Sequence, residues 1–98
     1  MKISSMKGVE SLSNLRQINL SNNQITEIDY IDHCKLLEEL NLERNLISKI
    51  QKLEGLAYLK KMELGKNRIT QIEGISTLNN LLQLSLEDNA IDSLSEFP

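Results

Sequence analysis

The sequence contains few of the residues from which most small proteins build a core or a reactive site. Among its 98 residues there is no Trp, aromatic side chains make up 3%, and Pro and Cys occur once each. A core must therefore be assembled from Leu, Ile and other aliphatic side chains. One cysteine cannot close an internal disulfide, and one His with one Cys falls short of the ligands that a zinc ion needs. We therefore expect no metal and no other cofactor.

Long hydrophobic runs are missing as well. No apolar segment approaches the roughly 18 residues of a membrane span, and no apolar stretch of a signal peptide follows the charged start. The net charge of -3 and the pI near 5.1 lack the basic footprint that nucleic-acid binding requires. We expect neither a membrane nor a nucleic acid as partner. Together with the single cysteine, this favours an intracellular and cytoplasmic protein, with cytoskeletal, ciliary or nuclear sites left open.

The sequence does contain a repeat with a fixed period of 22 residues. Its most regular members are four asparagines, Asn23, Asn45, Asn67 and Asn89. Each stands in the frame Leu-x-x-(Ile, Leu or Met)-x-Leu-x-x-Asn-x-Ile, and the four repeats start near Leu15, Leu37, Leu59 and Leu81. Repetition at this period predicts a stacked solenoid, here a single domain spanning residues 1–98.

Apolar residues elsewhere in the repeat keep the same period. The Leu-x-Leu step alternates as a strand does, so repeats in register predict short parallel strands about 4.8 Å apart. The remaining apolar residues are spaced by three, which suits 3₁₀ turns or short helical pieces on the opposite side of the coil. These inward columns are Ile28, Ile50, Ile72 and Leu94; Val9, Ile31, Leu53, Ile75 and Phe97; and Leu12, Cys34, Leu56 and Leu78.

The repeated asparagine falls where the chain leaves the strand and turns inward. Backbone groups at such a turn lack the partners that a sheet would supply, and a carboxamide offers both donors and an acceptor. The four asparagines are therefore predicted to form a structural ladder, with identical amides stacked from coil to coil.

This pattern resembles the leucine-rich repeat, and in particular the 22-residue subclass typified by the nuclear regulatory subunit of protein phosphatase 1. The resemblance covers residues 9–97. It implies an α/β solenoid in the form of a right-handed arc, with short parallel strands on the concave face and 3₁₀ or short helical turns on the convex face. It also implies a protein that binds other proteins, commonly on its concave sheet.

The two ends of the sequence fall inside repeats. The chain starts within a convex segment, and Phe97 occupies an inward column that another strand should follow. Terminal repeats without polar caps expose core residues and a strand edge. The sequence therefore predicts that these residues are part of a longer repeat array. The alternative is a short chain whose ends are covered by a partner, and end-to-end contacts through the uncapped repeats are left open.

Nothing in the sequence forms a recognisable catalytic set. His33 and Cys34 are adjacent, and adjacent residues rarely face each other; Cys34 stands in a column of leucines and is expected to be a small buried hydrophobe. The glycines form no phosphate-binding loop. Carboxylate pairs such as Glu38–Glu39 are expected on an open face, with no cleft to support general acid–base catalysis. The sequence predicts a protein that is not an enzyme.

The register of the repeat also predicts which side chains face solvent on the concave side. Residues 59–80 carry a net charge of +4 - 2 = +2, whereas residues 81–98 carry four acids and no base. Charges that alternate across strands, such as Arg16, Glu38 and Lys60, can neutralise one another instead of meeting a partner. Leu46 and Leu82 are the most apolar candidates on this side. The predicted protein-binding residues are Glu39, Lys61, Glu63, Lys66, Arg68 and Glu87.

The leading functional hypothesis is a non-catalytic module that binds a protein partner on its concave face. One alternative is a segment of a larger cytoskeletal or ciliary scaffold that packs end to end. The other, implied only by the resemblance, is a regulatory subunit of a protein phosphatase.

Overall fold

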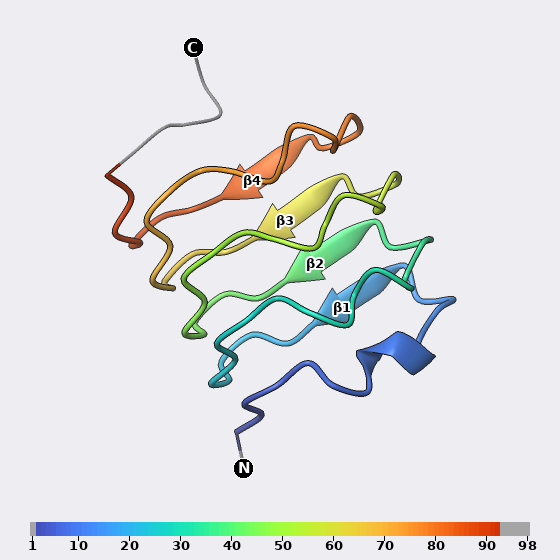
Figure 1. Ribbon diagram of the computed structural model, residues 1–98, viewed down its shortest axis with the longest axis horizontal. Helices are drawn as coiled ribbons and strands as arrows, with labels where there is room; N and C mark the ends of the chain where they lie inside the picture. Colours follow the sequence, from blue (N-terminus) through green and yellow to red (C-terminus); the bar gives the residue numbers. More distant parts are fainter. Residues whose placement is uncertain (1, 93–98) are drawn as a thin grey trace.

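Four short strands, one from each repeat, form a parallel sheet in sequence order (Figure 1). The computed structural model describes residues 2–92. The strands are β1 (Gln17–Asn19), β2 (Glu39–Asn41), β3 (Lys61–Glu63) and β4 (Gln83–Ser85). Each residue pairs with the one 22 positions further along, so that Ile18 lies beside Leu40 and Leu40 beside Met62. The central residues of β1, β2 and β3 are buried and their outer residues are more exposed, whereas the central Leu84 of β4 is partly buried against the core.

The return segment of each coil is made of consecutive turns. The N–H of Cys34 donates to the carbonyl of Ile31 at 3.0 Å, and the N–H of Leu37 donates to that of Cys34 at 3.1 Å. These bonds span three residues, which matches the spacing of the apolar side chains that the turns direct inward. Only η1 (Val9–Ser11) is long enough to count as a 3₁₀ helix, and residues 2–92 contain no α-helix. The predicted leucine-rich-repeat solenoid is therefore confirmed, and its convex side is built from turns with very little helix.

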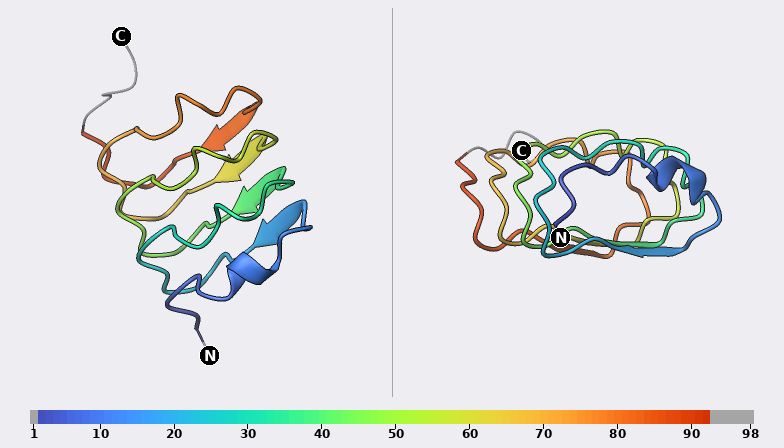
Figure 2. Two further views of the ribbon diagram at one scale, coloured as in Figure 1. Left: turned by 45° about the vertical axis from the view of Figure 1, so that its right-hand side comes forward. Right: turned by 90° about the horizontal axis from the view of Figure 1, so that it is seen from below.

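The core runs along the stack as a continuous column inside the coils, which form a closed loop when viewed along the stack (Figure 2, right). The central coils bury their aliphatic side chains completely, as at Leu42, Leu53 and Leu64. Burial weakens toward the first coil, where Leu12 and Leu15 are 42% and 41% exposed. These two leucines were predicted to be buried, but they are only partly covered. Little of the described chain stacks against the outer side of β1. Leu94 and Phe97 of the predicted columns lie outside the described residues.

The segment before η1 extends the stack by part of a coil, which the repeat frame above does not include. The Ile3 N–H donates to Asn23 Oδ1 at 2.9 Å, and the Ile3 carbonyl accepts the Gln24 N–H at 2.8 Å. Met6 is only 2% exposed and belongs to the core. The signal was present in the sequence, because Ile3 and Met6 stand 22 residues before Ile25 and Ile28.

Left-handed backbone also recurs with the period of the repeat. The residue before each ladder asparagine has a φ of 56–60°, at Asn22, Arg44, Lys66 and Asp88. A second such column, on the return segments, comprises Gly8, Tyr30, Lys52 and Gly74. At Gly74 a side chain would also collide with its surroundings, since an added Cβ would lie 2.8 Å from the carbonyl oxygen of Ile50.

Candidate protein-binding face

The repeated asparagines tie each coil to the one before it through the backbone. Asn45 Oδ1 accepts the Ile25 N–H of the preceding coil at 3.0 Å. Its Nδ2 donates to the Leu20 carbonyl of that coil and to the Leu42 carbonyl of its own coil, both at 3.0 Å. The amides therefore connect through main-chain groups that lie between them. Among the described residues, no buried side-chain nitrogen or oxygen is left without a partner.

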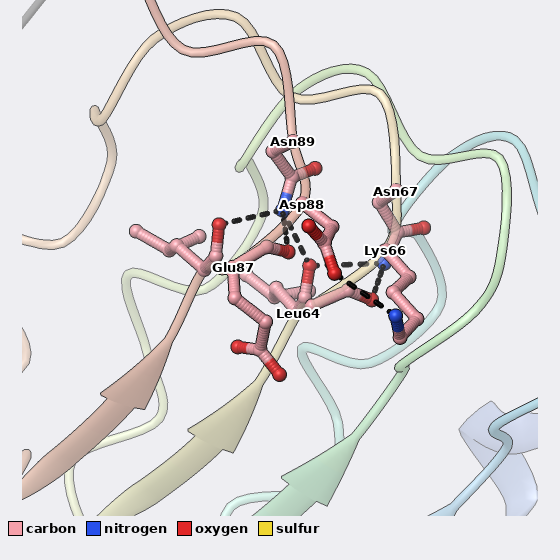
Figure 3. Close-up of polar contacts among 8 residues, drawn as sticks. Leu64, Lys66, Asn67, Glu87, Asp88 and Asn89 are labelled. Carbon is pink, nitrogen blue, oxygen red and sulfur yellow. Dashed lines mark hydrogen bonds and ion pairs between the residues drawn. The ribbon is translucent and has the colours of Figure 1, made fainter.

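The same arrangement holds the rim beyond β3 and β4 (Figure 3). Asn89 Nδ2 donates to the carbonyls of Leu64 at 2.9 Å and Leu86 at 3.0 Å. The Lys66 N–H donates to the Glu87 carbonyl at 2.8 Å, and Lys66 Nζ lies 2.9 Å from Asp88 Oδ2. The ladder thus fixes the backbone from which the charged rim residues project.

Three of the six predicted contact residues lie together on the outward face of the sheet. Glu39 is the register partner of Lys61, and Glu63 follows on the same strand as Lys61. Lys66 and Glu87 lie together on the rim, joined through the backbone. Arg68 stands apart from these five, because it follows Asn67 where the chain has already left the sheet, and its N–H donates to the Ile47 carbonyl at 2.8 Å.

Gly65 leaves room for the carboxylate of Glu87. A Cβ added at Gly65 would lie 2.6 Å from Glu87 Oε2 and 2.7 Å from Cδ. The Glu87 side chain therefore folds back over the preceding coil at the one rim position of the column that carries no side chain. The space above Gly65 therefore influences the direction in which Glu87, one of the predicted binding residues, points.

Ion pairs neutralise part of this face. Glu38 lies between two cations, with Arg16 Nη1 at 2.9 Å and Lys60 Nζ at 3.1 Å from its carboxylate oxygens. Hydrogen bonds from Lys60 and then from Arg16 lower the pKa of Glu38, and Lys66 lowers the pKa of Asp88 in the same way. Charge alternation across strands thus produces pairs at Arg16–Glu38–Lys60.

Glu39 and Lys61 carry opposite charges and are register partners, but they form no ion pair with each other. Lys61 Nζ lies 3.8 Å from Glu63 Oε1 on its own strand, while Glu39 accepts a hydrogen bond from Gln17 Nε2 at 3.4 Å. Within residues 2–92, the side chains of Glu39, Arg68 and Glu87 form no ion pair. These three charges are therefore available to a partner.

Two shallow hollows lie at the ends of β3 and β4 where the chain enters the sheet, and both are lined by Lys60 and Leu82. The first, of about 400 Å³, is completed by Glu38, Tyr58, Asn79 and Asn80. The second, of about 460 Å³, is completed by Glu39, Lys61 and Gln83. Leu82 is 81% exposed and Tyr58 57% exposed, whereas Leu46 is partly buried. Tyr58 was not among the predicted contacts, although its column of Asn14, Leu36, Tyr58 and Asn80 could be read from the period.

His33 and Cys34, the adjacent residues that could have carried chemistry, lie in different environments. Cys34 is fully buried, its Sγ lies 3.5 Å from the Val9 carbonyl oxygen, and burial raises the pKa of its thiol. His33 is exposed. In the described part of the chain, no group of three or more His, Cys, Asp and Glu side chains could hold a metal ion. None of the helical segments in that part has the length and apolar character needed to cross a membrane.

The chain belongs to the leucine-rich repeat family. The family profile described as Leucine Rich repeats (2 copies) matches residues 3–56, more than half of the sequence. Domains of this family generally mediate protein–protein interaction. The exposed polar side chains of the sheet described above agree with such a function. No curated protein matches the chain at a significant level. The resemblance to the phosphatase-subunit subclass stays a prediction.

Several solved structures are similar to this chain. An internalin (inlF) from Listeria monocytogenes is 28% identical with a TM-score of 0.84, and the match covers 96% of this chain and 28% of that chain. A chain of the Drosophila melanogaster SNF/U2A' complex is 25% identical with a TM-score of 0.78, and the match covers 99% of this chain and 57% of that one. The functional domain of InlJ from Listeria monocytogenes has a TM-score of 0.82 at 18% identity, over 95% of this chain and 20% of that chain, and shares the fold alone. This chain thus spans less than two thirds of each of these chains.

Proposed function

We propose that the chain is a non-catalytic module that binds a protein partner across its concave strands and their rim. The observation that carries this proposal is the contrast between a backbone held rigidly by the asparagine ladder and an open face of charged side chains. A rigid surface binds at a lower entropic cost than a flexible one. The contact residues are Glu39, Lys61, Glu63, Lys66, Arg68 and Glu87. The solved SNF/U2A' complex, which contains a structural neighbour, supports a protein as partner.

The size of the sheet indicates what kind of interface this would be. Four strands about 4.8 Å apart make a sheet only ~20 Å wide, and the described stack measures 35 × 33 × 17 Å. A standard interface needs roughly 800 Å² from each partner. The sheet face therefore binds through charge complementarity and shares the contact with its rim, or with further repeats if these residues belong to a longer array.

Charge reversal tests the proposal. The Lys61→Glu, Arg68→Glu double variant is immobilised beside the wild type, and proteins retained from a cell extract are quantified by mass spectrometry. The matched control is Lys35→Glu with Lys49→Glu, which reverses two exposed lysines outside the sheet and rim. Partners retained by the wild type and the control should be lost from the test variant, with unchanged circular dichroism. Equal retention by all three proteins would exclude this surface.

A scaffold function is favoured by one observation, the exposure of apolar side chains on the outer side of β1. Leu12, Leu15 and Ile3 are 42%, 41% and 46% exposed there. End-to-end packing against another coil would cover them and the free edge of β1. Analytical ultracentrifugation distinguishes this alternative: self-association that is lost in a Leu12→Ser, Leu15→Ser variant supports a scaffold, and a monomer at all concentrations argues against it. Phosphatase regulation rests on resemblance alone.

A further inference from the structure

One column of side chains alternates in charge and then stops alternating. Arg16, Glu38 and Lys60 occupy successive coils and form two ion pairs through the shared Glu38 carboxylate. The next member is Leu82, whose N–H donates to the Lys60 carbonyl at 2.8 Å. Lys60 therefore has an acid on its β2 side, which it shares with Arg16, and a hydrophobic side chain on its β4 side.

The neighbouring column shows the same one-sided arrangement. Lys61 has the acidic Glu39 as its register partner on β2 and the uncharged Gln83 as its partner on β4. Among the described residues, neither Lys60 nor Lys61 therefore has an acid on its β4 side, and Lys61 forms its ion pair along its own strand, with Glu63 at 3.8 Å. On the β4 side of both lysines, the structure offers uncharged and apolar groups.

The hollows described above lie at this uncharged side. Leu82 and Lys60 line both of them, so that they form a boundary shared by the two hollows. Tyr58 contributes an exposed ring to the first hollow. Asn80 Nδ2 donates to the Ala57 carbonyl at 2.7 Å, and this bond holds the two loops that flank the hollow together. The site therefore combines two apolar side chains, two ammonium groups and a fixed backbone.

We propose that these adjoining hollows bind an extended segment of the protein partner in which an apolar side chain stands next to an aspartate or glutamate. The apolar side chain would pack against Leu82 and Tyr58, and the carboxylate would lie on the β4 side of Lys60 and Lys61. It would supply the acid that continues the alternation of charge. This inference rests on the proposed function and specifies the partner's chemistry. The acids Glu38 and Glu39 in the same walls disfavour a polyanion such as a nucleic acid.

A direct probe is a short synthetic peptide in which leucine and phenylalanine alternate with aspartate. The Tyr30→Phe variant leaves Tyr58 as the single tyrosine, and the chain has no Trp, so tyrosine fluorescence reports on the hollow itself. We expect saturable binding with a Kd below about 1 mM, a change in Tyr58 emission, and weaker binding at higher salt. A peptide with asparagine in place of aspartate should bind about tenfold more weakly, as expected for the loss of a charge-assisted hydrogen bond. No saturable binding of the acidic peptide, or equal binding of both peptides, would overturn the proposal.

The Leu82→Glu variant tests the position of the carboxylate. It introduces the missing acid beside Lys60, so peptide binding should be abolished while the melting temperature is maintained or raised. The matched control is Ser76→Glu, which adds the same charge to an exposed position on the return segment before β4, where the other coils already carry Glu10, Asp32 and Glu54. Unchanged peptide binding by Leu82→Glu would overturn the proposal.

Retention of partner proteins from a cell extract by the immobilised variants distinguishes this inference from the proposed function. Loss of the partner from both Leu82→Glu and the Lys61→Glu, Arg68→Glu variant supports both. Loss from the double variant alone overturns the hollow as the docking site and leaves the concave-face function standing. Retention by both variants overturns both.

Discussion

Asn67 Oδ1 accepts the backbone N–H of Ile47, twenty residues earlier, at 3.0 Å. The same side chain donates to the Leu42 carbonyl of the preceding coil at 3.0 Å and to the Leu64 carbonyl of its own coil at 3.1 Å. One side chain therefore satisfies backbone groups of two coils at the point where both leave the sheet. Since the proposed contact residues project from this backbone, the geometry of the proposed binding face depends on the ladder.

Replacing Asn67 with Leu should destabilise the protein strongly. The change leaves several buried backbone groups without partners, and each costs roughly 1–3 kcal/mol. The comparison is Asn23→Leu at the first coil, because Asn23 is only partly buried. Its Nδ2 donates to two carbonyls of its own coil, and its Oδ1 accepts the exposed Ile3 N–H. Urea unfolding followed by circular dichroism should show the larger loss for Asn67→Leu. Equal losses of unfolding free energy in the two variants would mean that burial of the amide does not determine how much it contributes to stability.

The left-handed columns predict a stabilising glycine substitution. Lys52 has a φ of 65° at a position where Gly8 and Gly74 occupy the equivalent place in other coils. Left-handed backbone costs a non-glycine residue roughly 1–2 kcal/mol, whereas glycine loses about 0.5–1 kcal/mol through the entropy of the unfolded chain. Lys52→Gly should therefore be neutral or stabilising by up to about 1 kcal/mol, measured by urea unfolding. Lys49→Gly, at an exposed residue without positive φ, should destabilise, and the reverse order of these two variants would contradict the interpretation.

The ion pairs predict a loss of stability in acid. Glu38 and Asp88 have a lowered pKa in the folded protein, so each contributes stability that is present above its unfolded pKa and is lost as the pH falls through its folded pKa. The melting temperature should therefore fall progressively below about pH 4, near the unfolded values of Asp and Glu. Glu38→Gln should lower the melting temperature at neutral pH and flatten the acid dependence. Glu54→Gln, at an exposed position outside these pairs, serves as the control, and identical pH profiles for Glu38→Gln and wild type would refute the assignment.

The sequence predicted the parts of the fold that depend on apolar periodicity. A period of 22 residues places Leu40, Met62 and their equivalents inside the coil, and the structure confirms both the parallel register and the turns on the return segment. The period says less about the first coil. Leu12 and Leu15 occupy core columns but are half exposed, because burial in a solenoid requires a neighbour on each side.

The surface was harder to predict, because solvent-facing side chains can choose among partners. Lys61 lies opposite Glu39 in the register but forms its ion pair with Glu63. The hollow beside Leu82 depends on how Tyr58 and Asn80 project from a loop, which periodicity does not determine. Left-handed backbone at Arg44 and Lys66 was likewise not predicted, since these residues give no local signal for it.

Two glycines should respond in opposite ways to the same substitution. Gly74 has a φ of 71°, and its added Cβ would meet the rigid backbone oxygen of Ile50 at 2.8 Å. Gly65 has no positive φ, and its added Cβ would meet the flexible end of Glu87, which can move away. We expect Gly74→Ala to destabilise by about 1–3 kcal/mol, and Gly65→Ala to leave urea stability nearly unchanged. Because Gly65→Ala displaces the Glu87 carboxylate, it should instead weaken retention of the captured partner. A stable Gly65→Ala variant with wild-type retention would remove Glu87 from the proposed binding face.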